Sequence, residues 1–167
     1  MLRVLIADDE SKVCQLIEKL VDWDVLGMEV VAVAENGIEA LEKIKEFHPD
    51  IVITDIRMPG YDGLDLIRLG KEEAPNTEFV IISGYRHFEY AQMAIRYGVN
   101  AYLLKPIRKD ELTETLKRLS AHFKEQTEQL SLEEKRQRAI QSDEKNLRQA
   151  FSVSYTHLRA HETDQYL

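Results

Sequence analysis

Four short apolar runs, each followed at once by a polar side chain, constrain the fold of this chain most. The runs are rich in β-branched residues, and the polar groups that follow them are Asp8 with Asp9, Asp55, Ser83 and Lys105. Such runs are typical of a parallel sheet covered on both faces. Because ligands bind outside the carboxyl ends of parallel strands, we expect these carboxylates, the hydroxyl and the amine to gather at one edge.

The first 122 residues alternate between apolar runs and helical periodicity. We predict strands at 2–7, 29–34, 50–54, 78–82 and 101–104. Between them apolar residues recur at helical spacing, as in Leu112, Leu116 and Leu119. Asn36 followed by Glu39 predicts a capped helix start. Five βα units of this size predict one doubly wound, five-stranded parallel sheet with right-handed crossovers.

Residues 123–151 differ in character from the rest of the chain. They are highly charged, and apolar side chains such as Phe123, Leu130 and Ile140 recur at alternating steps of three and four. This pattern predicts a long helical linker. Polar residues occupy the middle positions of this three-and-four repeat, so two interpretations stay open, a coiled coil and a solvated helix without a partner.

Composition excludes several classes of function. The net charge of −8 disfavours sequence-independent nucleic-acid binding, which needs clustered Lys and Arg. Cys14 is the single cysteine, so no disulfide forms within the chain, and its place on an apolar helix face predicts a core thiol. The sequence contains neither a long apolar stretch nor a signal peptide pattern, so we expect no membrane span and a cytoplasmic protein.

The gathered polar groups predict phosphoryl transfer onto a carboxylate. An aspartate can attack phosphorus and form an acyl phosphate, so the protein has only to neutralise charge and hold geometry. Crowded carboxylates need a compensating cation, and Mg²⁺ is usually bound by one or two carboxylates, waters and phosphate oxygens. Asp8, Asp9 and Asp55 offer that acidic cluster, and Lys105 adds a positive charge.

Residues 1–122 resemble the receiver domain of two-component response regulators, whose fold is flavodoxin-like. The resemblance is carried by residues 4–10 (VLIADDE), 50–60 (DIVITDIRMPG), 81–84 (IISG) and 104–106 (LKP). It implies that Asp55 accepts the phosphoryl group and is also a Mg²⁺ ligand. It further implies that Asp9 binds Mg²⁺ directly, Asp8 through water, and Arg57 through its backbone carbonyl.

The same resemblance implies a switch and a set of partners. Ser83 would be the switch hydroxyl, Lys105 the phosphate-binding amine and Tyr102 the aromatic residue whose rotamer reports the state. The bond before Pro106 would be cis, as X-Pro bonds permit. The implied phosphoryl donor is a sensor histidine kinase. Phosphorylation is expected to favour a homodimer, and the protein is expected not to be a turnover enzyme, although it would promote its own dephosphorylation.

Two other classes of protein are alternatives, one because it also uses a nucleophilic aspartate and the other because it shares the strand pattern. A phosphohydrolase of the haloacid-dehalogenase type needs an acid two positions after the nucleophile, but Arg57 stands there and stays protonated. A flavodoxin-like FMN carrier needs a phosphate loop after the first strand, where Asp8, Asp9 and Glu10 would repel phosphate. Both are therefore disfavoured.

Two parts of the sequence bear on the output module, the domain through which a response regulator acts. Residues 82–91 and 98–106 resemble regulators that carry an AraC-type helix-turn-helix, yet no such DNA-binding module is recognisable in the sequence. Residues 152–167 break the linker pattern, and most of their codons can be read as a transposase-type sequencing-library adapter translated in frame. We therefore expect a truncated regulator with a non-native tail, in which the spacing of His157 and His161 carries no metal-site meaning.

Overall fold

Five parallel strands form one sheet in a computed structural model that describes residues 1–84 and 88–150, without the side chains of 88 and 143–150. The strand order is β2-β1-β3-β4-β5. The strands are β1 (Leu2–Ala7), β2 (Met28–Ala34), β3 (Ile51–Thr54), β4 (Glu78–Ser83) and β5 (Ala101–Leu104). The predicted doubly wound sheet is confirmed. Its order reverses between β1 and β3, where such folds bind ligands.

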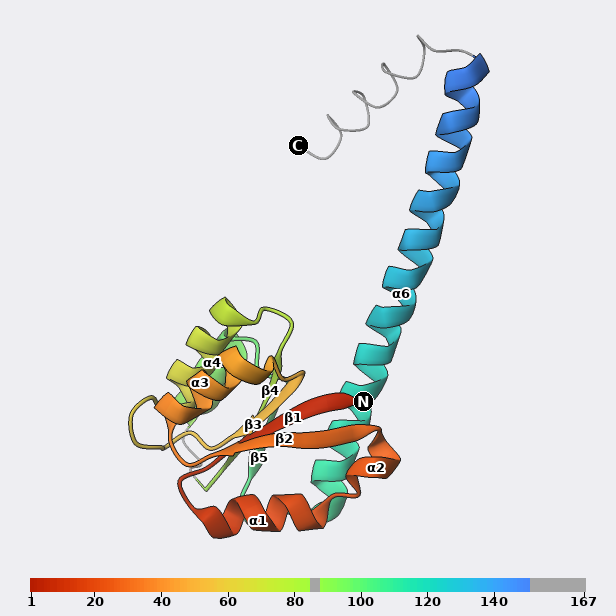
Figure 1. The fold of residues 1–167 in the computed structure, drawn as a ribbon. Coiled ribbons are helices and arrows are strands. Elements are labelled where there is room, and N and C mark those ends of the chain that lie inside the picture. The colour runs from red at the N-terminus through yellow and green to blue at the C-terminus, as the bar shows by residue number, and fades with distance from the viewer. Residues whose placement is uncertain (85–87, 151–167) are drawn as a thin grey trace. The chain divides into compact units, whose positions relative to one another are not determined.

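Helices cover both faces of this sheet. They are α1 (Ser11–Leu20), α2 (Trp23–Leu26), α3 (Gly37–Phe47), α4 (Gly63–Glu73), α5 (Phe88–Arg96) and α6 (Lys109–Ala150). Figure 1 shows α3 and α4 on one face and α1 on the other. The four-residue α2 was not predicted, since a single turn is too short to display helical periodicity.

The core explains why the strand residues are apolar. All four residues of β3 are buried, because this strand lies in the middle of the sheet and has a layer of helices on each face. The first turns of α6 bury Leu112, Leu116 and Leu119, as their spacing predicted. Cys14 is also buried, which agrees with its interpretation as a core thiol.

Helix ends follow the polar residues of the sequence. The Asn36 side chain accepts a hydrogen bond of 2.7 Å from the Glu39 backbone N–H, which confirms the predicted cap of α3. The Glu39 carboxylate reaches the N–H of Glu35, one residue before the position that a standard capping box uses. Asp62 caps α4 in the same way, through the N–H of Asp65.

The chain divides into two compact units, Met1–Ser120 and Ala121–Leu167. The boundary lies within α6, a helix of 42 residues. Across the described residues, none of the helices is long and apolar enough to cross a membrane. The segment 152–167, which was predicted to be non-native, lies outside the described residues, as do Tyr85, Arg86 and His87.

Candidate functional site

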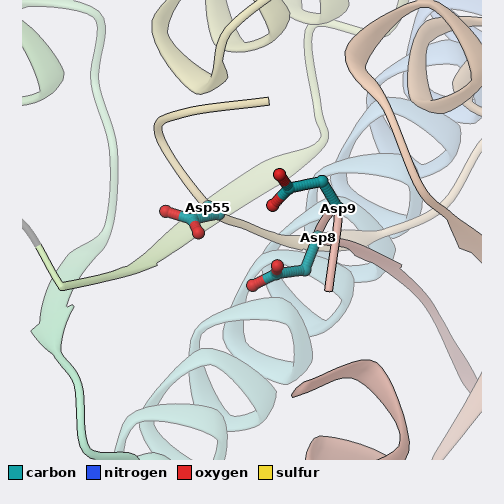
Figure 2. A group of neighbouring side chains, drawn as sticks. All are labelled: Asp8, Asp9 and Asp55. Carbon is teal, nitrogen blue, oxygen red and sulfur yellow. The ribbon is translucent and has the colours of Figure 1, made fainter. Parts of the chain in front are cut away.

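Three aspartates meet at the carboxyl ends of β1 and β3. These strands pair in parallel with Ala7 opposite Thr54, so the residues that follow them are neighbours. One carboxylate oxygen from each of Asp8, Asp9 and Asp55 lies within 4.8 Å of the others (Figure 2). Asp8 and Asp55 are buried, whereas Asp9 is exposed. The acidic cluster that the sequence predicted is therefore formed, and its all-oxygen donor set suits a hard divalent cation.

Lys105 enters this cluster from the end of β5. Its Nζ lies 3.0 Å from Asp55 Oδ2 and 3.2 Å from Asp8 Oδ2. The Lys105 side chain is 22% exposed, against 3% for Asp8 and 7% for Asp55, so the ion pairs lie at the edge of the interior. The Lys105 backbone N–H donates to the Ser83 carbonyl, and the Lys105–Pro106 peptide bond is cis.

Backbone amides hold the remaining carboxylate oxygens. Asp55 Oδ1 accepts a hydrogen bond of 2.7 Å from the Ile56 N–H, and Asp8 Oδ1 accepts one of 2.9 Å from the Glu10 N–H. Each buried carboxylate is thus oriented by one amide and by the shared ammonium of Lys105. Their positions are set before any ligand arrives.

Burial and charge shift the ionisation of these groups. Burial raises the pKa of Asp8, and the nearby charge of Asp55 raises it further, while the Glu10 N–H and Lys105 oppose the shift. Burial alone would lower the pKa of Lys105, but the hydrogen bond and charge of Asp55, with the charge of Asp8, outweigh burial and raise it. Lys105 is therefore an ammonium at neutral pH.

An open cleft gives access to the cluster. Its volume is about 270 Å³, and the residues that line it are Asp9, Glu10, Asp55, Arg57, Gly84 and Lys105. Arg57 is exposed, and it lies two positions after Asp55. A small anionic group can therefore approach Asp55 from solvent while Lys105 lines the same cleft.

Ser83 and Tyr102 form a second polar pair on the adjacent strands. Ser83 ends β4 and is fully buried, and β5 places Tyr102 opposite Ile81, two residues earlier on β4. The Ser83 and Tyr102 hydroxyls are hydrogen-bonded. Burial raises the pKa of Tyr102, whose ring packs against the core cluster. The structure thus brings Ser83 into contact with Tyr102.

Two glycines that the sequence analysis did not single out fix the loop after β3. A Cβ on Gly63 would lie 2.2 Å from the Asp55 carbonyl oxygen, and one on Gly37 would lie 1.8 Å from the carbonyl oxygen of Tyr61. The Gly37 N–H donates to the Pro59 carbonyl. A signal was present in the sequence, since both glycines directly follow a helix cap (Asn36, Asp62), a position where glycine has no helical advantage.

Comparison with known proteins identifies the family. Residues 4–117 match the response regulator receiver domain. The chain is similar to the transcriptional regulatory protein YesN of Bacillus subtilis, of uncharacterised function, at 41% identity over 75% of this chain and 34% of YesN. It is also similar to the transcriptional regulatory protein HptR of Staphylococcus aureus, at 36% identity over 77% of this chain and 50% of HptR.

Solved structures give the same result. The receiver domain of AraT, a response regulator from Geobacillus stearothermophilus, matches with a TM-score of 0.72 and 40% identity, over 75% of this chain and 98% of that domain. A receiver domain protein from Clostridium thermocellum matches with a TM-score of 0.67 and 30% identity, over 74% of this chain and 98% of that one. The chain spans between a third and a half of the curated relatives YesN and HptR.

Proposed function

Because the chain belongs to the response regulator receiver domain family, we propose that Asp55 accepts a phosphoryl group from a sensor histidine kinase. The observation that carries this proposal is the convergence of Lys105 on two buried carboxylates beside an open cleft. Receiver domains are signalling proteins and not turnover enzymes, so the product is the modified chain itself.

The transfer needs little from the protein beyond geometry and charge. An Asp55 carboxylate oxygen bonds to phosphorus as the P–N bond of the donor phosphohistidine breaks, and the released imidazole nitrogen takes up a proton. Lys105, already 3.0 Å from Asp55, remains as a counter-charge for the phosphoryl oxygens. Return to the free carboxylate requires attack of water on the acyl phosphate, which we propose the same site promotes.

The acidic cluster fits Mg²⁺, which would supply charge neutralisation for the phosphoryl oxygens. Asp8, Asp9 and Asp55 provide hard oxygen ligands, and the backbone carbonyl of Arg57, a cleft-lining residue, would complete the set. The raised pKa of Asp8 matters here, because only the ionised carboxylate attracts the cation.

Ser83 and Tyr102 are proposed to report the phosphorylation state. A phosphoryl oxygen at Asp55 would compete for the Ser83 hydroxyl, release Tyr102 and bias the face built from α5, β5 and α6. We propose that this change favours a homodimer. Light scattering with and without a phosphoryl mimic tests it, and an unchanged mass would count against the switch.

Intact-mass spectrometry tests the acceptor directly. Incubation with acetyl phosphate and Mg²⁺ should add one acid-labile phosphoryl group, and the addition should disappear in Asp55→Asn and weaken in Asp9→Asn. Asp62→Asn is the matched control, since Asp62 caps α4 and is not one of the three clustered carboxylates, and Asn caps equally well. Undiminished labelling of Asp55→Asn would refute the proposal.

The gene sequence tests two further proposals. We propose that residues 152–167 are adapter-derived and not native, and that the native gene continues into an AraC-type DNA-binding module. Under this proposal that module makes the contacts with DNA, and the phosphoryl-accepting residues do not. Independent sequencing of the locus should give different codons after 151; the same codons would overturn the proposed origin of the tail.

A further inference from the structure

Residues 124–142 of α6, the part after Phe123 whose side chains the structure describes, bury none of those side chains. Every residue from 124 to 142 is exposed, including Leu130 at 66% and Ile140 at 49%. Over this described stretch no ion pair links one turn to the next. Helices in water gain most of their stability from packing an apolar face against another surface. The apolar side chains of this described segment are exposed, so its apolar face packs against no other described residues.

The seam of this segment is symmetric about Lys135. The seam consists of the side chains at alternating steps of three and four, here Leu130, Glu133, Gln137 and Ile140. Their order, apolar, polar, polar and apolar, is the same when the helix is followed in the opposite direction. A second copy in antiparallel orientation would therefore place Leu130 opposite Ile140 and Glu133 opposite Gln137. A parallel copy would instead place Glu133 against Glu133, and two facing carboxylates repel.

Charge on the two sides of Lys135 favours the same orientation. Residues 128–134 carry three carboxylates (Glu128, Glu133 and Glu134) and no basic side chain. Residues 136–142 carry two guanidinium groups (Arg136 and Arg138) and no acidic side chain. An antiparallel copy lays each acidic segment beside a basic one, whereas a parallel copy aligns like with like. In the antiparallel pair, Glu134 lies near Glu134 of the second copy and Arg136 near Arg136 of the second copy. These like-charge pairs lie at the exposed rim, where interactions between charges contribute little free energy.

We propose that residues 128–142 of α6 bind a second copy of this chain in antiparallel orientation, centred on Lys135. The association goes beyond the proposed phosphoryl acceptance, because it needs neither a phosphoryl group nor the acidic cluster. The partner is identified as a second copy because the seam is complementary to itself in antiparallel orientation and because the two charged segments carry opposite charges.

Sedimentation equilibrium of the full 167-residue chain without any phosphoryl donor tests the association. Leu130→Ser should weaken it at least about tenfold, since it removes one seam leucine from each copy. Leu132→Ser is the matched control, because Leu132 is also 66% exposed but lies off the seam. A monomer at every concentration, or equal weakening by both variants, would overturn the proposal.

Cysteine cross-linking tests the orientation. An oxidised mixture of E133C and Q137C chains, one carrying a mass tag, should give the mixed disulfide in preference to either self-disulfide. The unchanged chain is the control, because its Cys14 is only 2% exposed and should not cross-link. A dominant E133C self-disulfide would show parallel pairing and refute the antiparallel assignment. Since no phosphoryl donor is present, either failure leaves the acceptor role of Asp55 untouched.

Discussion

Replacing Lys105 with Met removes the shared ammonium and keeps most of the side-chain volume. Two unit charges 4 Å apart attract by about 4 kcal/mol at an effective dielectric constant of 20, and Lys105 lies closer than this to both Asp55 and Asp8. Desolvation offsets much of that attraction. Loss of one partner from a buried pair typically costs about 3–5 kcal/mol. Because the Lys105 side chain is 22% exposed, we expect a loss nearer 2–3 kcal/mol.

Urea unfolding with and without Mg²⁺ measures this effect. The two carboxylates of the variant have lost their counter-charge, so Mg²⁺ should bind the variant more tightly and restore more stability to it than to the wild type. Lys45→Met is the matched control. Its partner Glu73 is 3.8 Å away, and both side chains are about half exposed, so it should cost less than about 0.5 kcal/mol. Equal losses in the two variants, or equal Mg²⁺ increments in Lys105→Met and wild type, would refute the reasoning.

Three further expectations follow from burial and close contacts. The raised pKa of Asp8 means that this group's contribution to stability is present below the unfolded value of 3.8 and is lost as pH rises through the folded pKa. Asp8→Asn should therefore raise the metal-free free energy of unfolding at pH 7 in urea titrations, and a decrease would contradict this. Gly63→Ala should cost at least about 2 kcal/mol in the same assay, whereas Gly84→Ala, with nothing within 4 Å of its Cβ, should be nearly neutral. Burial raises the pKa of Cys14 to about 11, so thiol reagents at pH 8 should modify it rapidly only after urea is added; equal rates would show that it is accessible.

The sheet could be predicted because its strands are buried on both faces. Each predicted strand agrees with the observed one to within a residue, since a run of β-branched residues bounded by polar groups has few other uses. The start of α3, which the single side chain of Asn36 fixes, was predicted equally well. The buried face of helix α1 was predicted less accurately. Leu16 fits the apolar spacing but is 46% exposed, because periodicity gives the face of a helix and not the width of the surface that covers it.

The site could be predicted as a set of residues but not as a set of contacts. Parallel strands had to bring Asp8, Asp55 and Lys105 to one edge, and the pairing of β1 with β3, of β3 with β4 and of β4 with β5 did so. That Lys105 would bridge both carboxylates depends on side-chain conformations and on the backbone after β5, which no local pattern encodes. The contact between Gly63 and the Asp55 carbonyl is likewise a tertiary distance, visible only once the loop after β3 has closed.

The hydrogen bond between Ser83 and Tyr102 limits how strongly phosphorylation can act. Ser83 is fully buried, so its hydroxyl exchanges one partner for another and gains no freedom in solvent. A hydrogen bond between neutral groups contributes about 0.5–1.5 kcal/mol and one to a charged acceptor about 1.5–3 kcal/mol. Their difference, about 1–2 kcal/mol, shifts a two-state equilibrium roughly 5- to 30-fold. We therefore expect the proposed switch to bias two populated states and not to convert one fully into the other. Any stronger response has to draw on contacts outside this pair, such as pairing between copies of the chain.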